Sequence, residues 1–367
     1  MSTTLSARFH ERGVVKVEAA ELAPLQKGEV RIKVAYAGIC GSDLHEVYHG
    51  PFTCCPVGAP HPLTGSTVPA TLGHEFSGVI EEVGEGVDES KLKKGTRVCI
   101  EPVISCRNCE NCKAGDRPLC NTQIGFFGYN RPGGLARYVN VTEANVHVVP
   151  ESVPLDIAAL AEPLAVAWHA VARSDFKAGE TAIVIGAGPI GAACVKVLNA
   201  LGASKIYVSE PTDTRRAIAT SCGADETFNP LEVDVVAEVR KRTGQGVHVA
   251  IDCAGTQRTF DASIEATKAK GRIVMVALWM PGNRPTIDMS GILFKERNLT
   301  GSCCFTSSDM QAVLAALADG SIQAADLITS RIMLQDIFEK GLEALRKQPE
   351  QVKILVDLEA TEKALQG

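Results

Sequence analysis

Several features are missing from this sequence, and each absence narrows what the protein can be. Nowhere do about 18 apolar residues follow one another, so no transmembrane helix is expected. The segment from Met1 to Glu11 lacks the apolar core of a secretory signal peptide. The last residues do not form the tripeptide that directs proteins to peroxisomes. We therefore expect a cytoplasmic protein.

The sequence also has no excess of basic residues over acidic ones. The chain has 37 Lys and Arg against 43 Asp and Glu, a formal net charge of −6, and no long basic run. A nucleic acid or a membrane surface is therefore not expected as a partner. There is no internal repeat and no low-complexity tract. With 367 residues and an ordinary share of apolar and charged side chains, the chain is long enough for two globular domains.

Cysteine, by contrast, is plentiful. The sequence has 13 cysteines, and without an export signal a disulfide scaffold is improbable, so metal binding gains weight. Five of them have spacings typical of metal ligands. The other eight are expected to be small buried hydrophobes or incidental surface thiols: Cys54, Cys55, Cys99, Cys194, Cys222, Cys253, Cys303 and Cys304.

The stretch from Gly38 to Glu75 combines the side chains that a catalytic zinc accepts. Cys40 supplies a thiolate near its start, and His74 and Glu75 supply an imidazole and a carboxylate at its end. A catalytic zinc needs about three protein ligands and one open position. For any single pair of these residues, the alternative is a buried cysteine and a histidine packed in the core.

Two further polar residues follow Cys40 closely. Ser42 and His45 are near enough in sequence to carry protons for a reaction at such a metal. From His45 to Leu72 the chain is rich in Pro, Gly and Thr and has no strong periodicity, which predicts a loop. A loop this long is usually functional or flexible, and this one could form a wall of a substrate pocket.

Four cysteines within a short segment predict a second metal site. Their C-x2-C-x2-C-x7-C spacing can close a tetrahedral shell of four thiolates, which excludes water and is typical of structural zinc. An iron–sulfur cluster is the alternative. The polar flanks favour an exposed zinc lobe at about residues 101–121. The four residues are Cys106, Cys109, Cys112 and Cys120.

The hydrophobic pattern divides the chain into three parts. Residues 1–155 contain short alternating runs typical of strands, such as Val30–Tyr36. Residues 156–298 alternate between strand and helix patterns, which predicts a doubly wound parallel sheet. Residues 299–367 are irregular and end in a strand at Val352–Asp357, which we expect to return to the first domain.

A glycine-rich loop lies inside the second part. Between a short apolar strand and a helix, the chain has Gly186-Ala187-Gly188-Pro189-Ile190-Gly191. In this setting Gly186 permits a tight turn, Gly188 lets the backbone approach a pyrophosphate, and Gly191 lets helix and strand pack closely. The pyrophosphate would lie at the helix N-terminus, where free N–H groups favour an anion. Pro189 and Ile190 at the helix start are therefore candidate cofactor contacts too.

An acidic residue indicates which dinucleotide binds. Glu210 ends the next predicted strand, at the place where a carboxylate accepts hydrogen bonds from the ribose hydroxyls and repels a 2′-phosphate. This favours NAD over NADP. Arg215 and Arg216 follow closely and could hold a phosphate, so acceptance of NADP stays open.

These motifs together resemble those of the zinc-dependent medium-chain dehydrogenases, and the resemblance covers nearly the whole chain. It depends most on Gly73-His74-Glu75 and the four-cysteine lobe. It implies an α/β protein with a GroES-like, mostly-β catalytic domain and a Rossmann domain. At Glu162 the chain has the glutamate of the polyol branch where liver-type alcohol dehydrogenases have a zinc-binding cysteine. The insertion from Glu46 to Pro69 is similar to that of the butanediol dehydrogenases within this branch.

The resemblance implies an NAD-dependent zinc enzyme that interconverts a secondary alcohol or vicinal diol and its ketone. The implied pair is (R,R)-2,3-butanediol and acetoin. A sorbitol- or xylitol-type polyol dehydrogenase and an L-threonine dehydrogenase are alternatives, and so is a non-catalytic NAD-binding relative. A homodimer or homotetramer is also implied.

The resemblance implies roles for the site residues as well. Cys40 and His74 would be zinc ligands, and either Glu75 or Glu162 would join them, one at a time. Ser42 would take the proton of the substrate and pass it towards His45, which has a suitable pKa to release it to solvent.

Overall fold

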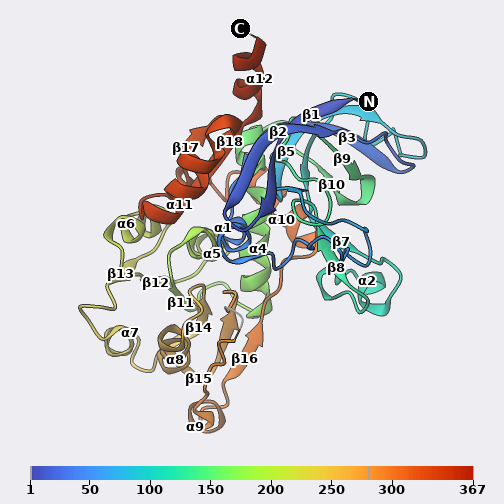
Figure 1. The fold of residues 1–367 in the computed structure, drawn as a ribbon. Helices are drawn as coiled ribbons and strands as arrows, with labels where there is room; N and C mark the ends of the chain where they lie inside the picture. Colours follow the sequence, from blue (N-terminus) through green and yellow to red (C-terminus); the bar gives the residue numbers. More distant parts are fainter. Residues whose placement is uncertain (1, 280–281, 367) are drawn as a thin grey trace. The chain divides into compact units, whose positions relative to one another are not determined.

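The structure is a computed structural model that describes residues 2–279 and 282–366, and its chain forms two compact units (Figure 1). The first unit comprises residues 1–162, 306–318 and 328–367, and the second comprises residues 163–305 and 319–327. Residues 299–305 and 319–327 were expected in the first domain but belong to the second. Residues 298–301 pair with the parallel sheet of that unit, and Asp326 forms an ion pair of 2.7 Å with the buried Lys196.

The first unit is built on two mainly antiparallel sheets, as its alternating sequence predicts, and β17 and β18 form a parallel pair in the larger one. The smaller has the order β2-β1-β4, and the larger has the order β10-β6-β5-β3-β18-β17, with β9 paired to β3. Strand β18 pairs with β3, so the predicted terminal strand does return to the first unit. The strands are β1 (Thr3–Glu11), β2 (Val14–Glu21), β3 (Glu29–Gly38), β4 (Ala70–Thr71), β5 (Glu75–Val83), β6 (Arg97–Ile100), β9 (Tyr138–Thr142), β10 (Val146–Val148), β17 (Ile328–Ile332) and β18 (Lys353–Asp357).

The helices of the first unit lie around these sheets. Residues 307–318 form one continuous α-helix, whereas residues 334–347 are divided into a 3-10 turn, a π-helical stretch and a short α-helix. The elements are α1 (Gly41–His49), α3 (Leu155–Ala158), α10 (Ser307–Ala318), η4 (Leu334–Asp336), η5 (Ile337–Glu343), α11 (Ala344–Lys347) and α12 (Leu358–Gln366).

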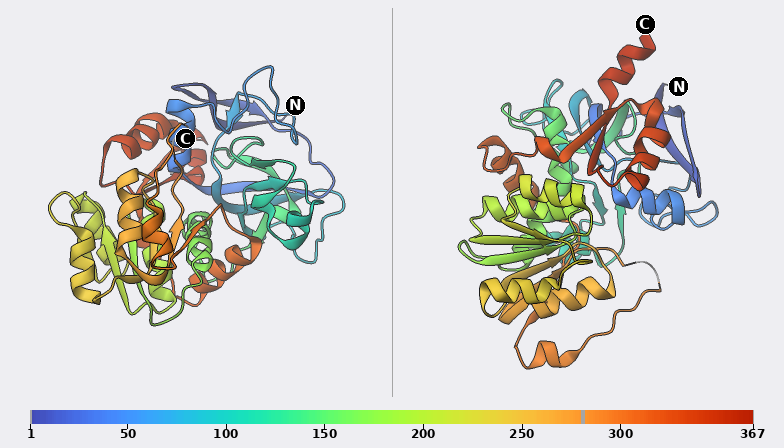
Figure 2. Two further views of the ribbon diagram at one scale, coloured as in Figure 1. Left: turned by 90° about the horizontal axis from the view of Figure 1, so that it is seen from below. Right: turned by 90° about the vertical axis from the view of Figure 1, so that its left-hand side faces the viewer.

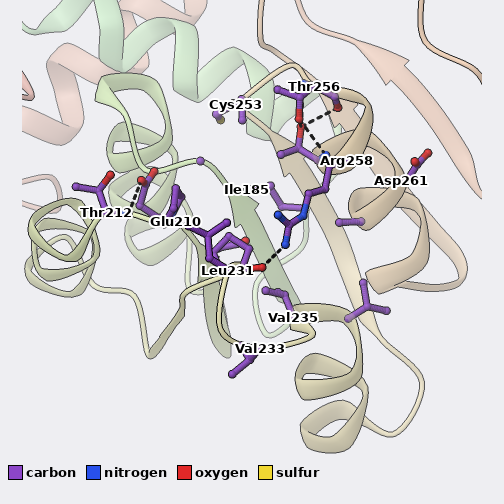
Figure 3. A pocket seen from close by; sticks show the side chains of 18 of the residues that line it. Ile185, Glu210, Thr212, Leu231, Val233, Val235, Cys253, Thr256, Arg258 and Asp261 are labelled. Carbon is purple, nitrogen blue, oxygen red and sulfur yellow. Dashed lines mark hydrogen bonds between the residues drawn. The ribbon is translucent and has the colours of Figure 1, made fainter. Parts of the chain in front are cut away.

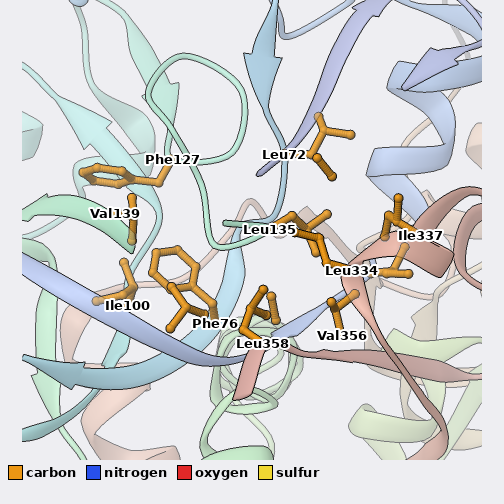
Figure 4. Close-up of a cluster of buried hydrophobic side chains, with 14 of the residues drawn as sticks. Leu72, Phe76, Ile100, Phe127, Leu135, Val139, Leu334, Ile337, Val356 and Leu358 are labelled. Carbon is orange, nitrogen blue, oxygen red and sulfur yellow. The ribbon is translucent and has the colours of Figure 1, made fainter. Parts of the chain in front are cut away.

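The core of the first unit joins the two ends of the chain. Figure 4 shows Leu72, Phe76 and Leu135 packed beside Leu334 and Val356, all of them buried. Burial of such side chains contributes about 1.5–3 kcal/mol each. The C-terminal segment is therefore part of the structure that supports β5, where His74 and Glu75 lie.

The second unit is a parallel six-stranded sheet of order β13-β12-β11-β14-β15-β16, and it confirms the predicted Rossmann architecture. Helices cover both faces of this sheet (Figure 2). The strands are β11 (Thr181–Ile185), β12 (Lys205–Ser209), β13 (Glu226–Phe228), β14 (Val247–Asp252), β15 (Thr267–Met275) and β16 (Asn298–Gly301). The helices are α4 (Ala161–Arg173), α5 (Pro189–Ala200), α6 (Asp213–Ser221), α7 (Val235–Thr243), α8 (Gln257–Ala266) and α9 (Met289–Leu293). Among the described residues, no helix has the length and apolarity needed to cross a membrane.

Candidate metal and dinucleotide sites

The pairing of β3 with β5 brings the first predicted ligand set together. Gly38 is opposite Glu75 in this antiparallel pair, so Cys40, just beyond β3, lies near His74 and Glu75. One ligand atom from each of the three lies within 4.8 Å of the others. Gly73 makes the sharp entry into β5 possible, since its φ is +94° and a Cβ there would lie 2.6 Å from the Leu135 nitrogen.

A buried carboxylate orients the imidazole of this set. Asp43 Oδ1 lies 3.5 Å from His74 Nδ1, which is buried and has no hydrogen-bond partner. Asp43 also accepts a hydrogen bond of 2.9 Å from the Cys40 N–H. Burial alone would lower the pKa of His74, but the negative charges of Asp43 and Cys40 raise it well above its usual value. A carboxylate behind one imidazole nitrogen, with the other directed to a metal, is a recurring arrangement in zinc sites, so the donors present fit the ion.

Glu75 is engaged by a lysine that sequence reasoning did not identify. Lys353 Nζ lies 2.7 and 2.6 Å from the two carboxylate oxygens of Glu75, and both side chains are buried. Burial acts to lower the pKa of Lys353, but Glu75 and Cys40 raise it above its usual value. The only available signal was a lysine within the apolar strand β18.

Glu162 is buried on the first turn of α4, and it is not part of the three-residue ligand group found among the described residues. Burial raises the pKa of Glu162 to about 8, while His74 acts to lower it and Glu75 to raise it. These influences indicate that Glu162 lies in the electrostatic neighbourhood of the set.

Of the two predicted proton carriers, Ser42 lies beside the ligand set and His45 faces solvent. Ser42 Oγ lies 3.3 Å from His74 Nε2, whereas His45 is exposed on the same helix, α1. Among the described residues, no hydrogen bond joins Ser42 to His45. The buried Tyr129 hydroxyl, which sequence reasoning did not identify, lies 3.0 Å from Ser42 Oγ and 3.1 Å from Asp43 Oδ1. Its single proton can be donated to only one of them at a time.

The segment between the two halves of the ligand set is more ordered than its composition predicts. Helix α1 occupies its first residues, and its Glu46 side chain is almost fully buried. The Glu46 carboxylate accepts hydrogen bonds from the N–H groups of Phe52, Thr53 and Cys54 at 2.9–3.0 Å. His61 is buried too and lies 3.0 Å from the Ile124 carbonyl oxygen. These bonds fix the insertion to the first unit.

The four-cysteine lobe has the geometry of a closed metal site. It is formed by β7 (Val103–Ser105), α2 (Glu110–Ala114), η1 (Arg117–Leu119) and β8 (Ile124–Phe126). All four thiol sulfurs lie within 4.8 Å of one another. The Cys106–Cys112 and Cys109–Cys120 sulfur pairs are 3.9 and 4.0 Å apart. Ligands at about 2.3 Å from a tetrahedral zinc are about 3.8 Å from each other, so the lobe fits this ion.

A buried glutamate joins this lobe to the sheet. The Glu101 Oε2 atom lies 2.5 Å from Arg117 Nη2 of the lobe and 3.2 Å from His147 Nε2 of β10. Ser307 Oγ, at the start of α10, donates to the same oxygen at 2.7 Å. The lobe is thus held in place by a charged contact as well as by its cysteines.

The glycine-rich loop lies between β11 and α5, as predicted. Gly186 has a φ of +91°, and a Cβ on Gly191 would lie 1.9 Å from the Gly186 carbonyl oxygen, so only glycine fits there. Gly188 has open space around it and caps α5, whose first two residues are Pro189 and Ile190. The loop borders a cavity of about 820 Å³.

Glu210 and Arg215 both line this cavity, and Figure 3 shows Glu210 beside Thr212. The buried Glu210 carboxylate accepts hydrogen bonds from the N–H groups of Ala187 at 2.8 Å and Thr212 at 3.0 Å. Arg216 donates to the Glu210 carbonyl oxygen at 2.7 Å and pairs with Asp213. Glu210 therefore holds the loop backbone in addition to facing the cavity.

Comparison with known proteins gives matches over both units. Residues 189–319 match the family described as zinc-binding dehydrogenase, and residues 26–151 match the alcohol dehydrogenase GroES-like domain. The chain is 40% identical to the (R,R)-butanediol dehydrogenase of Bacillus subtilis, over 96% of this chain and 99% of the relative. It is 38% identical to that of Neisseria gonorrhoeae, over 96% and 99%.

Solved structures agree with these matches. The crystal structure of the Bacillus subtilis 2R,3R-butanediol dehydrogenase superposes with a TM-score of 0.90 at 39% identity, covering 97% of this chain and 99% of that one. A zinc-binding dehydrogenase from Sinorhizobium meliloti bound to NADP gives a TM-score of 0.87 at 31% identity, covering 97% and 100%.

Proposed function

The chain belongs to the zinc-binding dehydrogenases with a GroES-like domain, and on this basis we propose that it oxidises a vicinal diol to a hydroxyketone with NAD. The proposed pair is (R,R)-2,3-butanediol and acetoin, the substrate class in the names of the relatives from Bacillus subtilis and Neisseria gonorrhoeae. The observation that carries the proposal is the group of Cys40, His74 and Glu75 within 4.8 Å.

Cys40 and His74 would hold the catalytic zinc, which supplies a Lewis acid for the alcohol oxygen. Asp43 would keep the proton of His74 on Nδ1, so that Nε2 is free for the metal. Because Glu75 is paired with Lys353, its charge is already compensated, and this pairing favours Glu162 as the third ligand. Glu75 would then replace Glu162 only by leaving Lys353.

Ser42 would accept the proton of the substrate hydroxyl at Oγ. Its neighbour Tyr129 is within hydrogen-bond distance and can steady that oxygen. The exposed His45 lies three residues further along α1, on the same helix face, and would release the proton to solvent. Since no hydrogen bond joins Ser42 and His45 among the described residues, we propose that a substrate hydroxyl or a water connects them.

NAD would bind in the cavity beside the glycine-rich loop. The N–H groups at the start of α5 would hold the pyrophosphate, and Glu210 would accept hydrogen bonds from the ribose hydroxyls. The hydride transfer itself belongs to the nicotinamide once it is placed. Cys106, Cys109, Cys112 and Cys120 would hold a second, structural zinc.

We also propose a cytoplasmic homodimer or homotetramer. Strand β16 is the last strand of its sheet, and the segment that connects β15 to it exposes large apolar side chains, among them Leu278, Leu293 and Phe294 at 76, 67 and 79%. An uncovered strand edge with exposed apolar residues favours association. Light scattering on the purified protein should give the mass of two or four protomers, and a monomer would contradict this part.

The substrate is tested by comparing rates of NADH formation. The three butanediol stereoisomers, sorbitol, xylitol and L-threonine are supplied in turn, with and without a zinc chelator. We expect the highest kcat/KM with (R,R)-2,3-butanediol and loss of activity with the chelator. A higher kcat/KM with a polyol or threonine would reject the proposed substrate, and activity that survives zinc removal would reject the metal.

A further inference from the structure

Two adjacent thiols follow the last strand of the parallel sheet. The sulfurs of Cys303 and Cys304 are 3.9 Å apart, Cys303 is exposed and Cys304 is half-buried. Neither residue belongs to the two groups of potential metal ligands found among the described residues. No step of the proposed reaction uses them.

The backbone at this pair is unusual. Cys304 has a φ of +50°, in the left-handed region that residues other than glycine seldom adopt. Backbone outliers of this kind persist where the surrounding structure fixes them, and they concentrate at functional sites.

The surroundings of Cys303 favour its thiolate. A hydrogen bond with the Cys304 thiol lowers the pKa of Cys303 to about 6, against the effect of burial, and His169 contributes in the same direction. The lowered pKa favours the thiolate of Cys303, which is the reactive form of a cysteine.

A second pair of neighbouring thiols in the same unit, Cys194 and Cys253, differs from Cys303 and Cys304 in its electrostatic surroundings. The sulfurs of Cys194 and Cys253 are 4.0 Å apart, but their hydrogen bond and burial raise the pKa of Cys253 well above its usual value. Cys194 is itself buried. Cys253 is half-buried, but its raised pKa keeps its thiol protonated, so it is expected to react less readily than Cys303.

We propose that Cys303 and Cys304 form a modification site for hydroperoxides, with Cys303 as the attacking thiol and Cys304 as the resolving thiol. An accessible cysteine of low pKa beside a second thiol is the arrangement of redox-sensitive sites. The proposal goes beyond the dehydrogenase activity and does not depend on it.

The chemistry is balanced with one equivalent of hydrogen peroxide. The Cys303 thiolate attacks one peroxide oxygen, the O–O bond breaks, and hydroxide leaves, so that the sulfur becomes a sulfenic acid. The Cys304 thiol then attacks this sulfur, the S–O bond breaks, and water leaves as the disulfide forms. Together the two thiols lose two hydrogens, and the peroxide is reduced to two waters.

The resulting disulfide would be easy to reverse. Consecutive Cα atoms are about 3.8 Å apart, which is shorter than the 4.4–6.8 Å usual between disulfide-bonded residues. Strained disulfides have more oxidising potentials and are the labile ones. A dithiol reductant should therefore restore the pair.

The site lies where it can affect the cofactor. Strands β11 and β16 run parallel in one sheet, so the glycine-rich loop after β11 and the thiols after β16 lie at the same carboxyl edge. Ligands of such sheets bind at this edge. Disulfide formation should weaken NADH binding by at least about fivefold, the lower end of typical coupling between sites. This step alone assumes the NAD site proposed above.

The test treats the zinc-loaded enzyme with one equivalent of hydrogen peroxide and maps the peptides by mass. We expect the peptide containing Cys303 and Cys304 to lose the mass of two hydrogens and to regain it with dithiothreitol. The C304S variant should stop at a sulfenic acid on Cys303 that dimedone traps. C303S should show neither product, and C55S, which removes a half-buried thiol elsewhere, should behave as wild type.

Oxidation of another thiol before Cys303, or release of zinc before the disulfide forms, would overturn the proposal. So would equal dimedone labelling of Cys303 and Cys55. The peptide map needs neither NAD nor substrate, so its failure is separate from a failure of the proposed function. An unchanged NADH affinity in the disulfide form, measured by fluorescence titration, would overturn the link to the cofactor.

Discussion

Lys353 and Glu75 form a buried ion pair beside the proposed catalytic zinc, with Nζ 2.6 and 2.7 Å from the two carboxylate oxygens. The residues are 278 positions apart in the sequence. Strand β18 brings Lys353 to this place because it pairs with β3, next to β5. The C-terminal strand therefore compensates the charge of one member of the possible ligand group.

Replacement of Lys353 should destabilise the first unit. In K353M the Glu75 carboxylate stays buried without its cation, and removal of one partner of a buried ion pair costs about 3–5 kcal/mol. Urea unfolding of the zinc-loaded enzyme measures this loss. The control is K94M, which breaks the exposed pair of Lys94 and Glu81 and should leave the midpoint unchanged. Equal midpoints for K353M and wild type would contradict the compensating role of Lys353.

Asp43 should determine how tightly zinc binds, because it orients His74. In D43N the His74 ring loses its carboxylate partner, and such changes reduce metal affinity about 10–100-fold. Competition with a chelator of known affinity measures the change. The exposed D88N variant should bind zinc as tightly as wild type. If D43N also retained wild-type affinity, His74 would not depend on Asp43.

Glu162 should give the zinc-depleted protein a distinct pH dependence. Its pKa rises from 4.5 to about 8 on burial, so between these values the folded state holds a proton that the unfolded state has lost. The stabilising contribution of Glu162 to the free energy of unfolding is therefore complete below about pH 4.5. It decreases as the pH rises towards 8, by up to about 1.4 kcal/mol per pH unit. The amide side chain in E162Q does not titrate, so this variant lacks the pH-dependent contribution.

The free energy of unfolding of E162Q relative to wild type should accordingly increase from pH 5 to pH 8. Urea titrations at several pH values measure it. E89Q, a change at an exposed position, should run parallel to wild type. A constant difference between E162Q and wild type across this range would show that Glu162 is not held neutral.

Much of the site was predictable because its signals are local. A few neighbouring residues indicate a backbone geometry or a ligand set in three places: the glycine loop, the four cysteines and Gly73-His74-Glu75. Each of them lies in the predicted element. Cys40 is separated from His74 by a long insertion, and its assignment to the same centre depended on the ligand types and on the motifs in the rest of the chain.

The rest depended on contacts between distant parts of the chain. Tyr129 reaches Ser42 across 87 positions, and Lys353 reaches Glu75 across 278, with no local pattern to mark either. Helix α1 was missed as well, because the Gly41-Ser42 start has low helix propensity. Asp43 compensates for this by accepting from the Cys40 N–H at the helix start.

Glu210 should set the preference between the two dinucleotides. In E210A the ribose loses its acceptor and the loop loses the bond to the Ala187 N–H, so kcat/KM for NAD should fall about 5–150-fold, the equivalent of about 1–3 kcal/mol. The ratio of NADP to NAD activity should rise. D261A removes a carboxylate from the same cavity without touching the loop and should keep the wild-type preference. An unchanged ratio in E210A would rule out the role of Glu210.

The sharpest test of zinc-dependent diol oxidation is the rate of NADH formation from (R,R)-2,3-butanediol by the C40S enzyme, because a serine cannot replace the Cys40 thiolate as a zinc ligand. We expect no measurable turnover, with NADH affinity within a few-fold of wild type because the dinucleotide cavity is unchanged. Butanediol oxidation at the wild-type rate would show that the catalytic metal does not need Cys40.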